Sequence, residues 1–214
     1  DEIRLRFDKS FEIDASERQT FVDSIKDYSG SYLSEEKDQI NNGLARLAAF
    51  DTFQDRKEVK SASPLAKFEL AHKEGERAGY GKASTIVRAS PQQIIAYFWH
   101  LKSRHKTNPQ ESKGKRVLEE TGHNKLVYVV KILPKPLTSR DFVMRYVWQK
   151  LDASSYAVVW APGSHPDYPE NNKDLIRALY PVTIKLTQLS EYETKIDYML
   201  QLVIGGVSSK KDSL

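Results

Sequence analysis

The sequence has no cysteine among its 214 residues, and it has no long apolar run. The absence of cysteine excludes disulfide bonds and thiolate metal sites, and it fits a reducing, cytoplasmic compartment. The longest apolar stretches cover only residues 94–99, 126–130 and 156–161, well short of the ~18 residues that a membrane-spanning helix needs. The chain starts at Asp1 without a signal-peptide pattern, so we interpret it as an intracellular piece of a larger, multidomain protein.

Sequence signatures of catalysis are also missing. The histidines form neither an HExxH pair nor a helical i, i+4 pair, and the chain has no Gly-x-Ser-x-Gly motif. Any acid–base pair would have to be assembled by the fold from residues that are distant in sequence. We therefore expect no enzyme, no metal and no cofactor. The histidines are His72, His100, His105, His123 and His165.

The net charge is weakly positive, at +4 with a pI near 9.0, and it is distributed unevenly. Between Lys102 and Arg116, six basic residues face one acidic residue, and Asn108-Pro109 favours a loop over a helix. This basic loop is either an ordinary solvated loop or a patch for transient contact with an anionic membrane, which would make the protein peripheral to membranes. No aromatic residues interleave with its charges, so nucleic-acid binding is not expected.

Residues 1–64 are predicted to form a strand and two helices that pack on the core or precede it. Residues 3–7 alternate apolar and charged side chains, as a half-buried strand does. A first helix is expected over residues 15–28. A second helix opens at Ser34, where two acidic residues suit the positive end of the helix dipole. Its apolar stripe either packs on its own domain or docks a partner. The stripe contains Ile40, Leu44, Leu47 and Ala48.

From residue 65 onward the pattern is that of a sheet interrupted by one helix. Ser90 and Pro91 form a favourable helix start, and this helix should end near residue 103. Strands are predicted over residues 65–71, 79–88, 126–133, 141–150, 156–161, 176–186 and 196–204. The last four carry apolar side chains at alternate positions. Since consecutive strands with short links pair antiparallel, their apolar faces should merge into one surface that a helix, a ligand or both must cover.

Three segments stand out by their order and spacing. Residues 81–99 run from a strand into a helix by way of Ser-Pro, and residues 140–143 read Arg-Asp-Phe-Val. His165-Pro166 then precedes Ile-Arg-Ala at residues 176–178. Together they resemble a START domain, the lipid-binding member of the helix-grip superfamily. The resemblance implies an α+β helix-grip fold, in which a curved antiparallel sheet encloses a hydrophobic cavity and grips a long C-terminal helix. It implies no catalysis and no metal.

Two features depart from the family's pattern. Residues 207–214 are too short and too polar for the C-terminal helix, so that helix lies beyond this sequence or the N-terminal helices cover the sheet. Sterol-binding members tend to carry a buried basic–acidic pair at the positions of Val127 and Tyr146. Because a buried charge is unfavourable unless it is paired, its absence implies a more apolar cavity with the Tyr146 phenol as its polar handle.

The charged residues of these segments have structural interpretations as well as functional ones. Arg140 and Asp141 are interpreted as an ion pair, or as hydrogen-bonding a turn at the start of their strand. Alternatively, Arg140 meets a lipid phosphate. Successive side chains of a strand point to opposite faces of the sheet, and this alternation puts Arg145 and Arg177 on the outer face. His165 is expected to hydrogen-bond within its loop.

These observations predict a monomeric domain with an N-terminal segment (1–64), a START-like sheet core (65–206) and a tail (207–214). Its ligand would be one phospholipid, sterol or fatty-acid-like molecule, held for transfer or sensing. The first alternative is a protein-interaction or regulatory module with a vestigial pocket, and the second is an enzyme on the same fold. The predicted cavity wall consists of Phe142, Tyr146, Trp148, Tyr156, Trp160, Tyr180, Tyr198 and Leu200.

Overall fold

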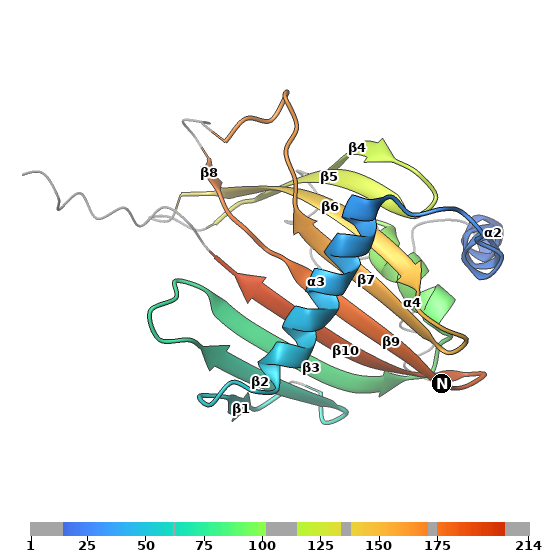
Figure 1. Cartoon of the computed structure of the whole chain (residues 1–214), viewed down its shortest axis with the longest axis horizontal. Helices are drawn as coiled ribbons and strands as arrows, with labels where there is room; N and C mark the ends of the chain where they lie inside the picture. Colours follow the sequence, from blue (N-terminus) through green and yellow to red (C-terminus); the bar gives the residue numbers. More distant parts are fainter. Residues whose placement is uncertain (1–14, 62, 102–114, 134–137, 171–174, 204–214) are drawn as a thin grey trace, which may run out of the picture.

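The computed structural model describes residues 15–61, 63–101, 115–133, 138–170 and 175–203 (Figure 1). Within these residues lie three helices and one large, curved sheet of ten strands. The helices are α2 (Ala15–Lys26), α3 (Ser34–Phe50) and α4 (Pro91–Trp99). The strands are β1 (Lys57–Val59), β2 (Ala66–His72), β3 (Gly79–Val87), β4 (Arg116–Glu120), β5 (Asn124–Lys131), β6 (Arg140–Lys150), β7 (Ser155–Pro162), β8 (Ile176–Arg177), β9 (Val182–Ser190) and β10 (Glu193–Leu202).

The strands follow the order β1-β2-β3-β10-β9-β7-β6-β5-β4, and neighbours in this order pair antiparallel. The short strand β8 lies off this path and pairs parallel with β6. Short connections bring β4, β5, β6 and β7 side by side, as is usual for consecutive strands. The last strand, β10, then inserts between β3 and β9, where Tyr198 lies opposite Ala83 on one side and Ile184 on the other. The sheet therefore joins the last strand, β10, to the early strands β1, β2 and β3.

Strand alternation sorts the side chains onto two faces. We call the face that carries Phe142, Tyr146 and Trp160 the inner face, because these residues belong to the largest core cluster. The opposite face, which carries Val147 and Val159, is the outer face. The alternate spacing predicted this division, and the register of β6 with β7 confirms it by placing Tyr146 opposite Trp160.

Helices α3 and α4 lie on opposite faces of the sheet, with α3 in front and α4 behind in Figure 1. On the outer face, Ile40 of α3 packs with Val147 and Val159. On the inner face, Ile94 and Trp99 of α4 belong to the largest core cluster. Of the two expected N-terminal helices, α3 therefore covers the outer face. Helix α4 covers part of the inner face, and Ile25 of α2 belongs to the same core cluster.

The predicted helix start at Ser90 is confirmed. Its Oγ accepts a hydrogen bond from the Gln93 N–H at 3.3 Å, and the Gln93 side chain accepts one from the Ser90 N–H at 2.9 Å. The helix ends at Trp99, earlier than predicted. The prediction of one strand over residues 176–186 is wrong, since the chain forms β8 and β9 with Pro181 between them. Proline has no N–H to donate to a neighbouring strand, which explains the break.

Two strands of the structure were not predicted, and three predicted segments lie outside the described residues. Strands β1 and β4 were not predicted, and β4 begins at Arg116, where the sequence suggested the end of a basic loop. The strand predicted over residues 3–7, the tail over 207–214 and the basic loop over residues 102–114 lie outside the described residues. The other predicted helices and strands are confirmed, with shifts at their ends.

Candidate functional site: a cavity between the inner face and helix α4

A small cavity lies between α4 and the inner face of the sheet, and we call it the inner cavity. Its volume is about 170 Å³, which is below the roughly 300–1,000 Å³ of sites for drug-sized ligands. Val129 and Met144 supply aliphatic surface. The aromatic part of the wall consists of Tyr97, Phe98, Phe142, Tyr146, Trp160 and Tyr180. A concave space with this wall suits a slender apolar ligand.

Ring stacking gives the inner cavity its shape. Tyr146 of β6 and Trp160 of β7 stack with their ring centres 4.6 Å apart and 11° between the ring planes. Phe98 reaches the sheet from α4, and its ring lies 6.2 Å from Trp160 and 6.3 Å from Tyr198. The Tyr198 and Tyr180 hydroxyls are hydrogen-bonded at 3.1 Å. Each aromatic pair contributes about 0.5–1.5 kcal/mol beyond the burial of its rings. These contacts hold the rings in place without a ligand, so the wall is preformed.

The three tryptophans differ in how their indole N–H groups are satisfied. Trp99 Nε1 donates to Glu120 Oε1 at 3.0 Å, and Trp148 Nε1 donates to the carbonyl of Gly122 at 3.1 Å. Trp160 is only 6% exposed and lines the inner cavity, yet its Nε1 has no acceptor among the described residues. A buried indole N–H usually finds a partner. Trp160 Nε1 is therefore a buried donor without an acceptor among the described residues.

Basic side chains border the inner cavity. His100, Lys115 and Lys131 line it, and none of its described lining residues is acidic. The Lys131 Nζ lies 5.2 Å from the centre of the Tyr180 ring. In the β5–β6 register, Lys131 is paired with Arg140 on the inner face. Lys131 and Arg140 therefore lie next to each other at this end of the inner face.

Lys125 fastens the end of α4 to the sheet. Its Nζ donates to the Trp99 carbonyl at 2.9 Å, lies 2.9 Å from Glu120 Oε1 and stands 4.2 Å from the centre of the Trp99 ring. The Trp99 carbonyl belongs to the last turn of α4, where a cation is favourable. Burial lowers the pKa of Lys125, although the contact with Glu120 opposes this effect. We call this contact set the Lys125 clamp, and it holds α4 over the inner cavity.

The predicted cavity residues fall into three groups. Four of the eight line the inner cavity, namely Phe142, Tyr146, Trp160 and Tyr180. Tyr198 packs beside them against Phe98, and Leu200 lines a second depression at the sheet edge. Trp148 and Tyr156 instead lie in the closed core, where each side chain hydrogen-bonds another part of the protein. Periodicity assigns all eight to the inner face, but it cannot say which of them packing leaves beside a space.

The interpretation of Arg140 and Asp141 as an ion pair is wrong. Adjacent residues of a strand point to opposite faces. Asp141 points to the outer face and accepts from Arg177 Nε at 3.1 Å and Nη2 at 2.8 Å, which raises the pKa of Arg177. Arg140 donates to the Thr138 carbonyl, as the alternative interpretation expected. Arg145 also lies on the outer face, as predicted, and opposes Leu126 in the β5–β6 register.

A buried polar cluster, which sequence reasoning missed, joins the start of α3 to the turn between β4 and β5. Glu36 accepts hydrogen bonds from Asn124 Nδ2 at 2.5 Å and His123 Nε2 at 2.8 Å. The Tyr28 hydroxyl donates to the other ring nitrogen of His123. Burial would raise the pKa of Glu36, but these hydrogen bonds and one from the Leu33 N–H outweigh it, so the pKa is lowered. Neither Glu36 nor His123 lines the inner cavity, and we interpret the cluster as structural.

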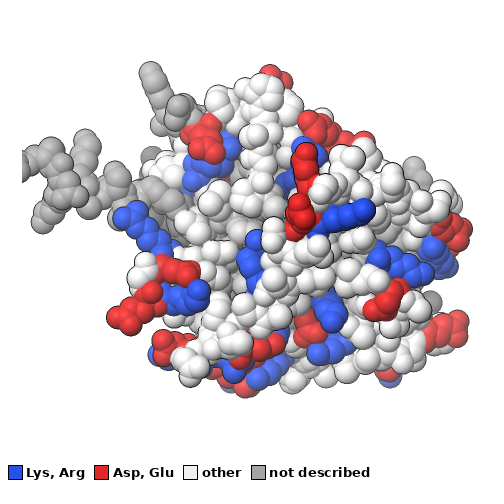
Figure 2. Space-filling view, viewed as in Figure 1, with Lys and Arg blue, Asp and Glu red and all other residues white. Residues whose placement is uncertain are grey.

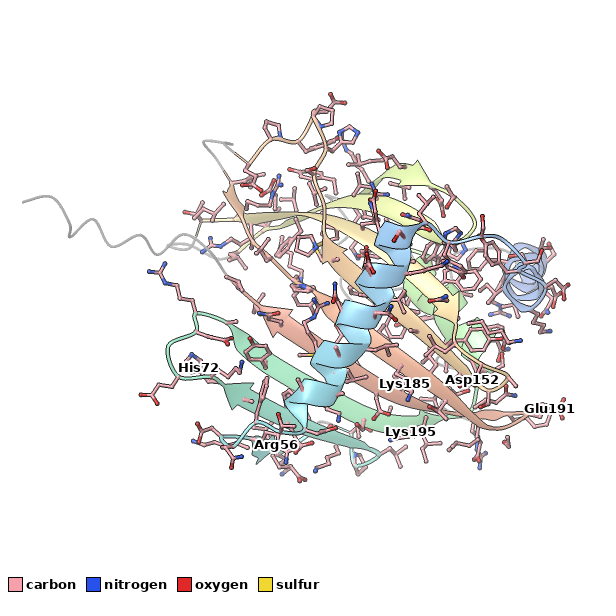
Figure 3. All side chains as sticks on the ribbon, in the orientation of Figure 1. Arg56, His72, Asp152, Lys185, Glu191 and Lys195 are labelled. Carbon is pink, nitrogen blue, oxygen red and sulfur yellow. The ribbon has the colours of Figure 1, made fainter. Side chains whose placement is uncertain are left out.

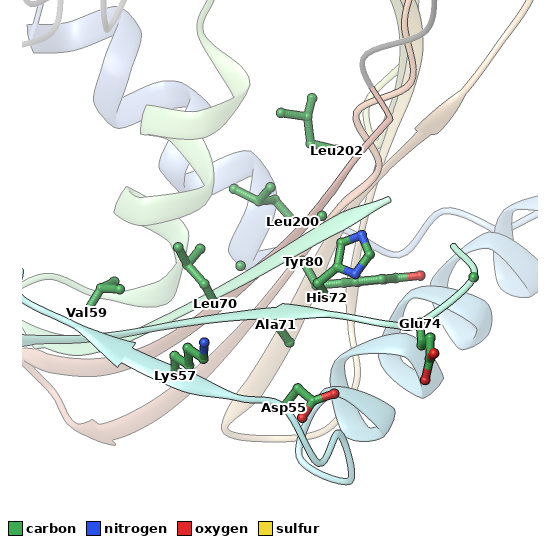
Figure 4. Close-up of a pocket in the computed structure, with 13 residues that line it drawn as sticks. Asp55, Lys57, Val59, Leu70, Ala71, His72, Glu74, Tyr80, Leu200 and Leu202 are labelled. Carbon is green, nitrogen blue, oxygen red and sulfur yellow. The ribbon is translucent and has the colours of Figure 1, made fainter. Parts of the chain in front are cut away.

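A second depression, the edge trough, lies where β1, β2, β3 and β10 meet (Figure 4). Its volume is about 770 Å³. Gly81 keeps it hollow, because a Cβ at this position would lie 3.4 Å from Leu70 and 3.6 Å from Leu200. Polar residues, among them His72 and Glu74, stand at one end. Its apolar wall consists of Val59, Leu70, Leu200 and Leu202.

The outer face and the sheet ends carry mixed charges. Figure 2 shows Lys and Arg interspersed with Asp and Glu on the α3 side, which is typical of a solvated surface. Figure 3 shows Asp152 and Glu191 at the same end of the sheet. Asp152 accepts from the N–H groups of Ser154 and Ser155 at 2.8 Å each. Hydrogen bonds from the Ser155 hydroxyl and from Ser154 lower the pKa of Asp152 to about 2.

Two further searches covered the described part of the chain. Within it, no helix combines the length and the apolar character that crossing a bilayer would require. In the same ranges, no three His, Asp or Glu side chains gather where they could hold a metal ion.

The topology defines the class of fold, which is an α+β helix-grip architecture built on a large curved antiparallel sheet. More particularly, it is the fold of StAR-related lipid transfer (START) domains. Human StAR-related lipid transfer protein 5 matches with a TM-score of 0.64 at 11% identity, over 83% of this chain and 87% of that one. Human STARD10 matches with a TM-score of 0.62 at 18% identity, over 78% and 68%. The lipid transfer and protein localization domain of human StarD13 (DLC2) matches with a TM-score of 0.58 at 17% identity, over 82% and 86%.

Comparisons of sequence add no relatives to this result. No protein-family model matches the chain, and no curated protein matches it either. At identities of 11–18%, the solved structures establish the fold that this chain shares with them.

Proposed function

We propose that this chain binds one hydrophobic ligand in the inner cavity and holds it for transfer or sensing within a larger protein. The observation that carries the proposal is the inner cavity itself, a preformed space with an aromatic wall beneath α4. Protein interiors are normally packed without such voids, so a retained apolar space suits a ligand. Two solved structures with the same fold are named for lipid transfer, which supports this choice of ligand.

A competing proposal is a protein-interaction or regulatory module with a vestigial pocket. The specific observation in its favour is the small volume of the inner cavity, about 170 Å³. The edge trough, whose Leu70 is 43% exposed, would then be the place for a partner. The two proposals differ in whether the inner cavity takes up ligand.

Native mass spectrometry of the purified chain, followed by organic extraction and lipid identification, tests the first proposal. We expect a stoichiometric lipid adduct, either co-purified or taken up from mixed liposomes. Val129→Phe fills the inner cavity and should abolish the adduct. Val130→Phe is the matched control, because Val130 neighbours Val129 on β5 but faces the opposite side of the sheet. A clean apo mass with every lipid, from a folded protein, would leave the interaction module as the better proposal.

Contact with anionic membranes through the basic loop remains a prediction. Of that loop, Lys115 and Arg116 lie in the described part of the chain, and Lys115 lines the inner cavity. Co-sedimentation with vesicles of phosphatidylserine and phosphatidylcholine, compared with phosphatidylcholine alone, would test it. We expect binding that needs the anionic lipid and weakens with salt.

A further inference from the structure

The inner cavity is too small to hold a whole lipid. Its volume is about 170 Å³, and an apolar cavity of roughly 150 Å³ engineered into another protein binds ligands of the size of benzene. A lipid with a long apolar body therefore needs further space. The edge trough has about 770 Å³. It lies on the inner face as well, because Leu200 in its wall is two positions from Tyr198 on β10 and packs against the same core cluster.

The sheet connects the two spaces through one row of paired residues. Trp160 of β7 pairs with Val182 of β9, and Val182 pairs with Leu200 of β10. The row continues to Gly81 of β3 and then to Leu70 of β2. Its first member lines the inner cavity, and its last three members line the edge trough (Figure 4). Only Val182 separates them in this row, so the two spaces are two strand spacings apart, or roughly 10 Å.

A hydrogen bond between two tyrosines crosses this row. Tyr180 precedes Val182 by two positions, and Tyr198 likewise precedes Leu200. Because β9 and β10 pair antiparallel, the two tyrosines lie on opposite sides of the row, and their hydroxyls are hydrogen-bonded at 3.1 Å. Phe98 of α4 stacks on Tyr198 with 6.3 Å between the ring centres. We call Tyr180, Tyr198 and Phe98 the aromatic bar. Val182, between the two tyrosines, is only 1% exposed.

The aromatic bar is made of side chains, and all three of its rings are only partly buried. Rotation about side-chain bonds moves such rings without breaking the sheet. We infer that the inner cavity and the edge trough are two parts of one lipid-binding groove, and that the ligand lies across Val182 once the Tyr180–Tyr198 hydrogen bond opens. The inference rests on the proposed function, because it extends the site of the same ligand. It assigns ligand contacts to Leu70 and Leu200.

Cysteine protection tests whether the ligand reaches the edge trough, because the chain has no cysteine of its own. Leu70→Cys places a thiol in the trough wall, where Leu70 is 43% exposed. Ile86→Cys is the matched control, since Ile86 is 50% exposed but lies five positions from Gly81 on β3 and so faces the outer side. If Leu70→Cys does not fold, Leu202→Cys in the same trough replaces it.

Native mass spectrometry first identifies which of palmitate, cholesterol and a diacyl phosphatidylcholine binds the chain. That lipid is then added while a water-soluble maleimide modifies the thiol. At a free lipid concentration of about ten times the Kd, modification of Leu70→Cys should slow about tenfold, because only the lipid-free fraction reacts. The rate for Ile86→Cys should not change.

Removal of one hydroxyl tests the aromatic bar. Tyr180→Phe keeps the ring, but opening the bar no longer breaks a hydrogen bond, so the same lipid should bind about fivefold more tightly. Benzene, which the inner cavity holds by itself, should bind wild type and variant equally. Tyr156→Phe is the matched control. The Tyr156 hydroxyl accepts from Gln92 Nε2 at 2.8 Å, and Tyr156 lies four positions from Trp160 on β7, away from the row. This control should leave the affinity unchanged.

The outcomes separate the inference from the proposed function. A lipid adduct that leaves Leu70→Cys fully reactive would overturn the extension into the edge trough, while the proposed function would stand. Unchanged or weaker lipid binding by Tyr180→Phe, or an equal gain in Tyr156→Phe, would overturn the role of the aromatic bar. Failure of all three lipids to bind the folded wild-type chain would overturn both the inference and the proposed function.

Discussion

Gly43 lies in the middle of α3, where the helix backbone meets the outer face of the sheet. A Cβ at this position would stand 2.6 Å and 2.9 Å from the two γ-carbons of Val159, and 3.0 Å from Thr183 Oγ1. The Thr183 hydroxyl also donates to the Gly43 carbonyl at 3.1 Å. Sequence alone predicts that Gly43→Ala stabilises the helix by about 1 kcal/mol. The structure predicts the opposite sign.

The change in the free energy of unfolding depends on how far the Val159 side chain can move. Val159 is fully buried and β-branched, so its methyl groups cannot swing away from a new Cβ. Overpacking of this kind costs typically ~1–3 kcal/mol. With the upper value set against the ~1 kcal/mol gain in helix propensity, Gly43→Ala should lower the free energy of unfolding by about 2 kcal/mol. In a chain of this length, that lowers the melting temperature by roughly 4–8 °C.

A double-mutant cycle with Val159→Ala isolates the contact. Because that substitution removes both γ-carbons and leaves only the 3.0 Å approach to Thr183 Oγ1, Gly43→Ala should be clearly less destabilising in the Val159→Ala background than in the wild type. Urea denaturation followed by circular dichroism would measure all four proteins. Asn42→Ala, at the exposed neighbouring position, is the matched control and should stabilise by about 0.5 kcal/mol. If Gly43→Ala had the same effect in both backgrounds, the close approach of Gly43 to Val159 would not determine the sign of the change.

Three further substitutions test the clamp, the polar cluster and the polar handle. Lys125→Met should lower the free energy of unfolding by about 1–2 kcal/mol and speed hydrogen exchange in α4, measured by mass spectrometry; unchanged exchange would remove the clamp role. Glu36→Gln should cost about 1–3 kcal/mol at neutral pH. Because the folded-state pKa of Glu36 lies below its ordinary value of 4.5, its contribution is complete above that value and is lost as pH falls through the lower folded-state pKa, so urea titrations of wild type and variant should converge in acid. Tyr146→Phe should weaken a hydroxyl-bearing ligand by about 1 kcal/mol in calorimetry, and unchanged affinity would eliminate this phenol as the polar handle.

Local patterns predicted the parts of the fold that depend on residues close in sequence. Alternation placed Phe142, Tyr146 and Trp160 on one face, because strand side chains alternate whatever the rest of the chain does. Ser90 began α4 because its cap needs only Gln93, three residues away. The break at Pro181 was also legible, since proline has no N–H for a neighbouring strand, and the single strand predicted there ignored that signal.

The remaining features depend on residues that only the folded chain brings together. Glu36 and His123 lie 87 positions apart and meet at 2.8 Å, and no local pattern links them. Arg177 pairs with Asp141 because β8 runs parallel to β6, a pairing that periodicity cannot reveal. The side chain of Trp160 resembles its neighbours on the inner face in sequence, yet it alone among the tryptophans is left without an acceptor in the described structure.

By itself, the sequence determined the strand faces, the start of α4 and a resemblance to the START fold, because periodicity, capping and motif order are properties of short segments. The tertiary structure decided which helix covers which face, which of the eight predicted residues surround a space, and which buried indole N–H lacks an acceptor among the described residues. Those outcomes follow from how side chains distant in sequence fill the volume between α4 and the sheet, and close packing is a property of the whole molecule.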